Sequence, residues 1–196
     1  MKLTTFLIGI DEVGRGPIAG PVAVGAFAFL TPGAKKLFRG VKESKQLTEQ
    51  KREEWFARIE QAKKSGHVDF CVTFQSEKVI DSKGLSYAIK TALLTSLYAL
   101  KIKPASARVL LDGGLRAPAN YQNQKTIIKG DEKEMVIALA SICAKVLRDR
   151  KMNMLAKKYP KYGFEKHKGY GTKGHYGAIR RCGLLSTHRR SFLRAF

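Results

Sequence analysis

The sequence predicts an α/β protein in which helices flank a mixed sheet and a small helical extension follows at the C-terminus. Three observations support this fold class. Two strand-like segments flank a Gly/Pro-rich turn near the N-terminus, helical and strand-like segments then alternate, and the composition changes near residue 150. With 196 residues, the chain is long enough for one domain with a substantial core and a small appendage.

The first two predicted strands, Leu3–Ile10 and Val22–Leu30, are rich in β-branched and aromatic residues. A helix is predicted next, because Thr48 is a favourable N-cap and apolar residues recur at helical spacing as far as Lys64. The buried stripe predicted for this helix consists of Trp55, Phe56 and Ile59. Val68–Phe74 alternates in polarity, which is typical of a strand.

The middle of the chain continues this alternation of helices and strands. Ser86–Lys101 is predicted to be a helix, since Ala and Leu recur there at helical spacing. Arg108–Leu111 is a short apolar strand that ends at Asp112, and Thr126–Ile128 is a further short strand.

The clearest predicted helix runs from Asp131 to Arg150. Asp131 and Glu134 have the spacing of a capping box, with Asp in place of Ser or Thr. Apolar residues wrap most of the circumference, which predicts that the helix is largely buried: Met135, Val136, Ile137, Ala138, Leu139, Ile142, Val146 and Leu147. One polar stripe remains, formed at spacings of four by Ser141, Lys145 and Asp149.

Residues 150–196 differ in composition from the rest of the chain. They contain thirteen Lys or Arg residues and one acid, Glu165, which gives a net charge of +12. Aromatic residues interleave with these charges, as on surfaces that hold phosphates while rings pack on sugars or bases: Tyr159, Tyr162, Phe164, Tyr170 and Tyr176. Because disordered segments are poor in aromatic residues, a folded, substrate-binding extension over 151–196 is predicted beside a catalytic domain over 1–150.

The charge balance points to nucleic acid. Lys and Arg total 37 against 16 Asp and Glu, a net charge of +21, and phosphate contacts are the usual way in which such an excess is neutralised. A membrane is not expected as partner, because no apolar stretch approaches about 20 residues. The three cysteines, Cys71, Cys143 and Cys182, lack metal-ligand spacing and are interpreted as reduced residues in or near the core, so a cytoplasmic protein is expected.

Four acids occupy positions that a core disfavours. Asp11 and Glu12 follow the first strand, Asp112 ends another, and Asp149 lies in the last predicted turn of the apolar helix, where the helix dipole disfavours an acid. Each has a structural explanation, such as a turn or a pair with Lys145. Together they could converge, and because clustered carboxylates repel one another they would need cations. Oxygen ligands favour Mg²⁺ or Mn²⁺, two of which can catalyse phosphodiester hydrolysis.

Distinctive blocks of sequence occur along nearly the whole chain. Three lie in the first two thirds: Gly9–Gly16, Glu43–Leu47 and Leu111–Gly113. The others follow: Lys129–Asp131, Ala140–Asp149, Tyr159–Phe164, His167–Thr172 and His188–Phe192. In this order the blocks resemble ribonuclease HII. Two blocks depart from that family, since Glu43 and Gln46 replace Asp and Lys and Gly113–Arg116 replaces a Gly-Asn pair.

The resemblance implies a ribonuclease-H-like sheet with a small helical C-terminal part. It assigns catalysis and the binding of two Mg²⁺ or Mn²⁺ ions to four acids: Asp11, Glu12, Asp112 and Asp149. It assigns contacts with the ribonucleotide to Gly14, Arg15 and Gly16, and stacking on the following deoxyribose to Tyr170, whose ring the flanking glycines would leave accessible. Phosphate contacts are expected from Ser44, Lys45, Lys129, Ser141, Lys145 and Lys168.

The activity implied is that of an endoribonuclease that hydrolyses the bond 5′ to ribonucleotides, leaving 3′-hydroxyl and 5′-phosphate ends. Its expected partners are RNA/DNA hybrids and duplex DNA with embedded ribonucleotides, so it would serve ribonucleotide excision repair and DNA replication. Two alternatives stay open, namely a ribonuclease HIII-like hybrid nuclease, which would carry an extra N-terminal domain, and a non-catalytic nucleic-acid-binding module. A monomer is expected, and the tail Phe192–Phe196 lacks the leading glutamine of the usual clamp-binding peptide.

Overall fold

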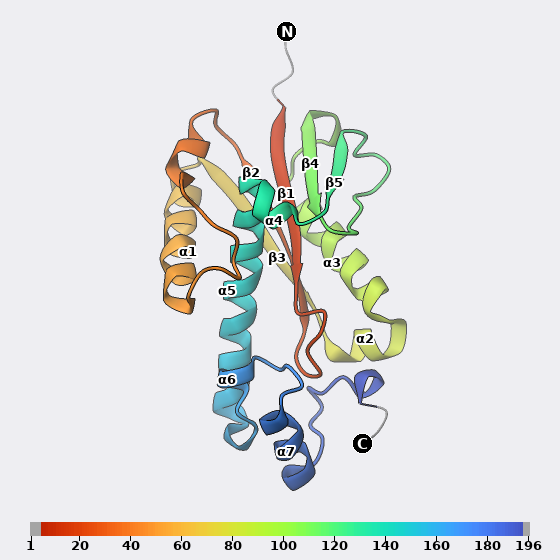
Figure 1. The fold of residues 1–196 in the computed structure, drawn as a ribbon. Helices are drawn as coiled ribbons and strands as arrows, with labels where there is room; N and C mark the ends of the chain where they lie inside the picture. The colour runs from red at the N-terminus through yellow and green to blue at the C-terminus, as the bar shows by residue number, and fades with distance from the viewer. Residues whose placement is uncertain (1–4, 194–196) are drawn as a thin grey trace.

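A computed structural model describes residues 5–193. Its centre is a five-stranded sheet with strand order β3-β2-β1-β4-β5 (Figure 1). The strands are β1 (Phe6–Val13), β2 (Val22–Phe29), β3 (Val68–Gln75), β4 (Ala107–Asp112) and β5 (Gln124–Ile127). β1, β2 and β3 pair antiparallel, whereas β4 is parallel to both β1 and β5. The predicted mixed sheet is therefore confirmed.

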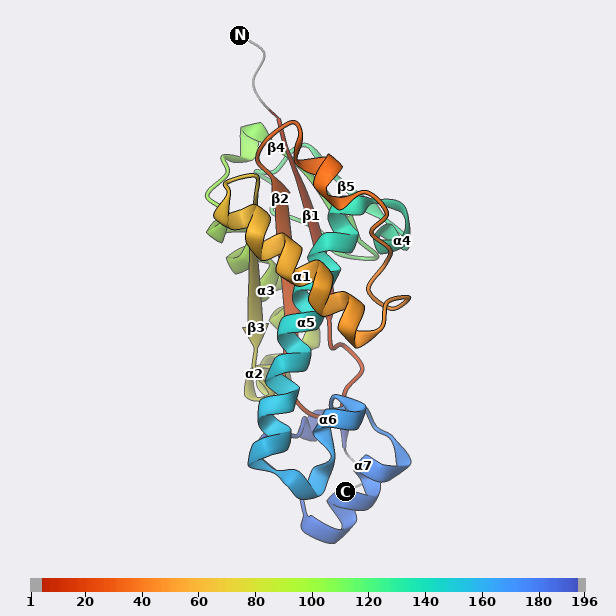
Figure 2. The same ribbon diagram turned by 90° about the vertical axis from the view of Figure 1, so that its left-hand side faces the viewer.

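Helices cover both faces of this sheet. One face packs against α5 (Met135–Lys158) and α1 (Glu49–Lys64), which cross each other in Figure 2. The other face packs against α3 (Leu85–Ala99), and α2 (Glu77–Lys83) precedes that helix. Because both faces are covered, the strands contain nearly continuous apolar sequence. As predicted, Thr48 is the N-cap of α1, and its side chain accepts a hydrogen bond from the Lys51 N–H.

Two glycines allow α5 to lie close to the sheet. A Cβ atom on Gly9 would lie 2.2 Å from the carbonyl oxygen of Val136, and one on Gly25 would lie 2.5 Å from that of Ala140. Both distances are shorter than real Cβ contacts, so only glycine permits this approach of helix and strands. The contact places Ser141 of α5 beside Asp11 of β1.

Two boundaries differ from the prediction. β1 extends to Val13, so Asp11 and Glu12 lie within the strand and do not follow it; the first predicted residues, Leu3 and Thr4, lie outside the described residues. The predicted capping box is wrong, because Asp131 lies in the separate short helix α4 (Gly130–Lys133). The N-cap of α5 is Glu134, whose side chain makes no capping hydrogen bond.

The long helix also ends later than predicted. α5 continues to Lys158, so Asp149 lies in its interior and the argument from the helix dipole does not apply. Residue 150, where the composition changes, lies within α5. The helix thus connects the sheet to the C-terminal part of the molecule without a break.

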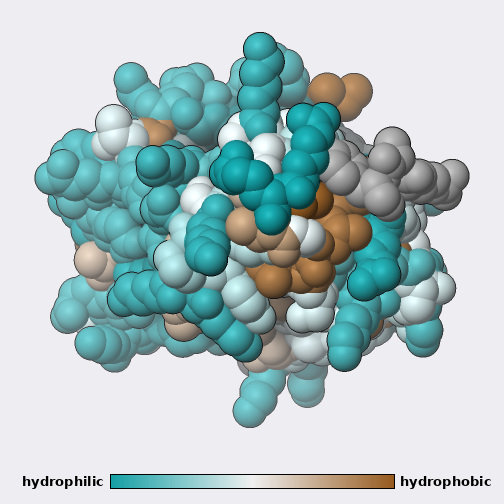
Figure 3. All heavy atoms as spheres, turned by 90° about the horizontal axis from the view of Figure 1, so that it is seen from below, coloured by the Kyte–Doolittle hydropathy of each residue, from teal (hydrophilic) through white to brown (hydrophobic). Residues whose placement is uncertain are grey.

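The C-terminal part is helical, as predicted. It contains α6 (Phe164–His167) and α7 (Lys173–Cys182), with short 3₁₀ turns at Pro160–Tyr162 and Arg190–Phe192. Its apolar cluster joins the end of α5 to the loop after β1: Ile18, Ala19, Met152, Ala156, Tyr162, Phe164, Ala178, Ile179 and Leu193. Figure 3 views this end, where mostly hydrophilic residues surround a compact apolar patch.

The three cysteines differ in their burial. Cys143 is buried and Cys71 is partly buried, but Cys182 is exposed, so the prediction that it lies in or near the core was wrong. Among the helices of the described residues, none combines the length and the hydropathy needed to cross a bilayer. The tail beyond Leu193 lies outside the described residues.

Candidate active site

Two of the predicted acids, Asp11 and Asp112, lie on neighbouring parallel strands. The register of β1 and β4 pairs Ile10 with Leu111, so the next residue on each strand is an acid. Because side chains alternate between the two faces of a strand, Asp11 and Asp112 both belong to the face that α5 covers. Glu12 follows on the opposite side of β1.

A further acid, Asp131, reaches the same place from α4. The N–H of Gly130 donates to Oδ1 of Asp112 at 2.6 Å, which fixes the start of α4 against the end of β4. Asp131 is buried, and its charge acts on Asp11 together with the charges of Glu12 and Asp112. We call these four residues, Asp11, Glu12, Asp112 and Asp131, the acid cluster.

The environment disfavours a full set of negative charges in the acid cluster. Burial raises the pKa of Asp11 to about 8; a hydrogen bond with Ser141 opposes this shift and the neighbouring acids add to it. Burial also raises the pKa of Glu12, although the hydrogen bond from Arg15 and its positive charge lower it in part. A bound cation would reverse both effects, because an opposite charge nearby favours the ionised carboxylate.

The carboxylates of the acid cluster accept hydrogen bonds from separate donors. The pairs are Asp11 Oδ1 with the Glu12 N–H (2.8 Å), Glu12 Oε1 with Arg15 Nη1 (2.8 Å), Asp112 Oδ1 with the Gly130 N–H (2.6 Å) and Asp131 Oδ2 with Lys45 Nζ (3.2 Å). Oε2 of Glu12 is buried and has no partner among residues 5–193. An orphaned carboxylate oxygen amid buried acids fits a hard divalent cation, for which oxygen is the preferred ligand.

A second group of acids adjoins the cluster. Glu43, Asp131 and Glu132 place ligand oxygens within 4.8 Å of one another, and within the described part of the chain they form the one such group. Lys45 pairs with Asp131 at 3.2 Å and Lys129 pairs with Glu132 at 3.2 Å, so two lysines already balance this group. Asp131 is thus shared between both sets of acids.

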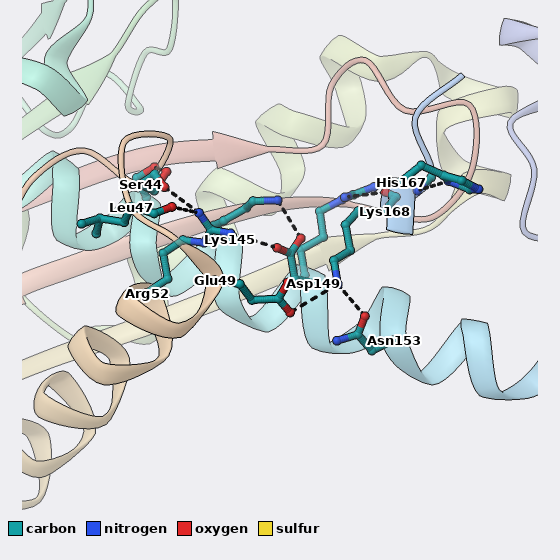
Figure 4. Close-up of polar contacts among 12 residues, drawn as sticks. Ser44, Leu47, Glu49, Arg52, Lys145, Asp149, Asn153, His167 and Lys168 are labelled. Carbon is teal, nitrogen blue, oxygen red and sulfur yellow. Dashed lines mark hydrogen bonds and ion pairs between the residues drawn. The ribbon is translucent and has the colours of Figure 1, made fainter. Parts of the chain in front are cut away.

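The structure does not bring Asp149 to the acid cluster. Asp149 lies eight residues after Ser141 on α5, which corresponds to about 12 Å along the helix axis. Its carboxylate pairs with Lys145 at 2.8 Å and lies 3.9 Å from Arg52 (Figure 4). Two metal ions that share ligands lie only about 4 Å apart, so Asp149 is too distant to join Asp11. Asp131 lies beside the other three acids instead. The Lys-Gly-Asp block was the available signal for it, but the residue was interpreted as a helix cap.

The remaining predicted polar residues divide into buried and exposed sets. Ser44 and Ser141 are buried and hydrogen-bonded to each other at 2.8 Å, next to Asp11. Lys168 is buried and donates to Asn153 at 2.6 Å (Figure 4). The side chains of Lys45 and Lys129 are 78% and 68% exposed, so both remain accessible to a phosphate beside the acids.

The segment after β1 meets the C-terminal part at Tyr170. Gly14 has φ +93°, a conformation that favours glycine. Arg15 and Gly16 are exposed, and a Cβ on Gly16 would lie 3.7 Å from Cε1 of Tyr170. The ring of Tyr170 is 46% exposed, which confirms that it is accessible. The predicted sugar-contacting residues therefore come together beside the acid cluster.

Two buried arginines were not recognised in the sequence. Arg148 and Arg189 are both 0% exposed, although Arg189 was counted with the basic surface of the C-terminal part. Their guanidinium groups donate to backbone carbonyls of the loop between β1 and β2, and Arg148 Nη1 also donates to the carbonyl of Lys168 at 3.1 Å. Their partners are backbone atoms distant in sequence, so no side-chain pattern could have revealed them.

Three histidines lie together next to the Tyr170 turn. His175 Nδ1 bonds to the carbonyl of Tyr170 at 2.9 Å and must therefore donate, which leaves its Nε2 as acceptor for His188 Nε2 at 3.1 Å. His188 Nδ1 in turn accepts from the Leu185 N–H at 2.8 Å. The ring of His167 stacks on that of His175 at 4.2 Å. Burial lowers the pKa of His175 to about 4, so His175 holds the Tyr170 turn in its neutral form.

Comparisons with known proteins identify the family. The family model for Ribonuclease HII matches residues 8–195. A relative named Ribonuclease HII from Caldicellulosiruptor bescii is 43% identical over 189 residues, spanning 96% of this chain and 87% of the relative.

Solved structures give the same result for the fold. The ribonuclease H2 of Pyrococcus horikoshii OT3 superposes with a TM-score of 0.74 at 25% identity, over 97% of this chain and 96% of the other. The ribonuclease HII of Archaeoglobus fulgidus, solved in a complex with PCNA, gives a TM-score of 0.72 at 25% identity, over 97% and 100% of the two chains.

These matches identify the family among the alternatives that the sequence left open. The family model is that of ribonuclease HII, over nearly the whole chain, and the buried acids agree with a catalyst better than with a binding module. The chain therefore belongs to the ribonuclease HII family and is a metal-dependent endoribonuclease.

Proposed function

We propose that this enzyme hydrolyses the phosphodiester 5′ to a ribonucleotide, both in RNA/DNA hybrids and at single ribonucleotides in duplex DNA. One observation supports this specificity above all. β1 carries Asp11 and Glu12 and leads directly to Gly14–Gly16, which lie against the exposed ring of Tyr170. Four residues of extended chain span at most about 14 Å, so a sugar held at Gly16 would lie close to the acids.

The proposed division of labour follows from this arrangement. Asp11, Glu12, Asp112 and Asp131 would hold two Mg²⁺ or Mn²⁺ ions, which when bound supply an activated water and stabilise the leaving oxygen. Gly14–Gly16 would contact the 2′-hydroxyl, the group that distinguishes RNA from DNA, and Tyr170 would stack on the following deoxyribose. The products would carry 3′-hydroxyl and 5′-phosphate ends.

The cationic residues would position the phosphates of the substrate. Lys45 and Lys129 are the exposed members of this set beside the acids. Lys145 and Arg52 are instead paired with Asp149, so we assign Asp149 to the orientation of these two cations. The substrates we propose are duplexes that contain ribonucleotides, and we propose a cytoplasmic location for the enzyme. We also propose that it acts as a monomer.

The test uses a labelled DNA duplex with one ribonucleotide, an all-DNA duplex and a long RNA/DNA hybrid. We expect a single metal-dependent cut 5′ to the ribonucleotide, no cut in the all-DNA duplex, and cleavage of the hybrid. Cleavage of the hybrid without a cut at the single ribonucleotide would refute the proposed specificity.

The identity of the fourth ligand is tested by a matched pair of variants. We expect Asp131→Asn to abolish cleavage to the same extent as Asp11→Asn, and Asp149→Asn to keep measurable activity with a higher KM. Loss of activity in Asp149→Asn with near-native activity in Asp131→Asn would restore the assignment made from sequence.

A further inference from the structure

In the loop between β1 and β2, residues 14–21, five backbone carbonyls accept hydrogen bonds from two guanidinium groups. Arg189 donates from Nη2 to the carbonyl of Gly14 (2.7 Å), from Nη1 to that of Arg15 (3.0 Å) and from Nε to that of Gly20 (2.9 Å). Arg148 binds only the end of the loop, where its Nε lies 2.9 Å from the carbonyl of Pro21 and its Nη2 lies 3.4 Å from that of Ala19. Both arginines therefore hold the end of the loop, and Arg189 alone holds its start.

Burial of these two positive charges is unfavourable unless hydrogen bonds to the loop compensate for the loss of water. Both are fully buried, and within residues 5–193 neither has a carboxylate within 4.0 Å. Burial and the positive charge of Arg148 together lower the pKa of Arg189 to about 10. Isolated buried charges are costly, so the carbonyl dipoles must stabilise the guanidinium of Arg189 and are themselves held in a fixed direction by it.

The direction of the carbonyls determines the direction of the neighbouring N–H groups. The described residues contain no cis peptide bond, and in a trans peptide the C=O and N–H groups point in opposite directions. Since the carbonyls of Gly14 and Arg15 point toward Arg189, the N–H groups of Arg15 and Gly16 point away from it. Both residues are exposed, and no hydrogen bond within residues 5–193 uses either N–H. The N–H of Gly16 belongs to the residue that faces Tyr170.

We propose that Arg189 is a positioning residue that orients the N–H groups of Arg15 and Gly16 toward the 2′-hydroxyl of the ribonucleotide. The inference rests on the proposed role of Gly14–Gly16 in contacting that hydroxyl. Three bonds in a fixed fork require arginine, because the single ammonium group of lysine cannot reproduce a planar arrangement of donors. Arg189 thereby connects the C-terminal part to the recognition of ribose, without touching the substrate.

The experiment compares Arg189→Lys with the wild-type enzyme in the presence of a chelator, so that binding is measured without cleavage. The two probes are a DNA duplex with one ribonucleotide and the same duplex with deoxyribose throughout. We expect wild type to prefer the ribonucleotide and Arg189→Lys to lose about tenfold of this preference, the factor that corresponds to about 1.4 kcal/mol or one hydrogen bond. Affinity for the all-DNA duplex should stay within twofold, because phosphate contacts lie elsewhere.

Tyr162→Phe provides the matched structural control. The hydroxyl of Tyr162 donates to the carbonyls of Cys182 and Gly183 at 3.0 and 2.7 Å, so its removal weakens the same C-terminal part without changing the loop. We expect this variant to be destabilised and to keep the full preference for the ribonucleotide. An unchanged preference in folded Arg189→Lys, or an equal loss in Tyr162→Phe, would overturn the inference.

A second measurement on the wild-type enzyme applies even where Arg189→Lys does not fold. In ¹⁵N–¹H spectra, the amide resonances of Arg15 and Gly16 should shift with the ribonucleotide duplex and not with the all-DNA duplex. If wild type shows no preference between the duplexes, the proposed function fails. If it shows a preference and neither amide responds, only the inference fails.

Discussion

Replacement of Gly9 by alanine should separate α5 from the sheet and lower both stability and activity. A Cβ at this position would lie 2.2 Å from the carbonyl oxygen of Val136, whereas ordinary contacts begin near 3.4 Å. Helix and strand must therefore move apart by about 1 Å, and overpacking of this kind costs about 3 kcal/mol. For a chain of this size that corresponds to a fall in Tm of about 6 to 12 °C.

Urea unfolding and thermal unfolding of Gly9→Ala measure this cost. Gly33→Ala is the matched control, since a Cβ there would meet nothing within 4 Å and its φ is not positive; we expect a change within about 0.5 kcal/mol. Gly25→Ala pushes on the same helix, so the double variant should lose less than the sum of the two single losses. A Gly9→Ala protein as stable as Gly33→Ala would refute the reasoning.

The effect on activity follows from the position of Ser141. Ser141 lies five residues after the contact at Val136 and hydrogen-bonds to Asp11. A shift of α5 would lengthen this bond, and we expect kcat to fall at least tenfold while KM changes little. The measurement is steady-state cleavage of the duplex with one ribonucleotide, at a temperature where Gly9→Ala is fully folded.

Three further predictions concern other parts of the molecule. Burial lowers the pKa of His175 from 6.5 to about 4, so the unfolded chain binds a proton that the folded chain excludes; stability should be full above pH 6.5 and fall as the pH drops toward 4. Urea titrations across this range check it, and the slope should be smaller in His175→Gln. Gly14→Ala should lose activity, and its free energy of unfolding should fall by at least about 2 kcal/mol, the combined cost of a positive φ and a clash. The clash arises because the added Cβ would lie 2.3 Å from Arg148 Nε. A melting temperature close to that of wild type would contradict this prediction. Lys45→Ala should reduce the slope of log affinity against log salt by about one phosphate contact, and an unchanged slope would exclude that contact.

Elements defined by neighbouring residues could be predicted from the sequence. The cap at Thr48 and the strand β2 depend on contacts within a few residues, and both were correct. The start of α5 was wrong because Glu134 adopts an extended conformation between α4 and α5. That break allows Asp131 to turn toward Asp11 of β1. Because Asp11 lies more than a hundred positions earlier in the chain, the local sequence gives no sign of this contact.

In the candidate site, too, features set by neighbouring residues could be predicted and those set by distant contacts could not. Asp11 and Asp112 could be brought together from sequence because each is recognisable in relation to a strand, and parallel strands place such residues side by side. Asp149 could not be separated from Asp131, since distance along a helix matters only once its contact with the sheet is known. Arg189 looked like any surface cation because its partners are carbonyls about 170 residues away.

The continuity of α5 has a consequence for where the substrate is cut. Ser141 beside Asp11 and Met152 under the loop after β1 belong to one uninterrupted helix, and eleven residues of helix fix their separation at about 16 Å. The spacing between the hydrolysed phosphate and the sugar that is recognised is therefore a rigid property of the fold. Such an enzyme would cut only at a fixed distance from the sugar that its loop holds, so phosphodiesters further along the same strand would remain intact.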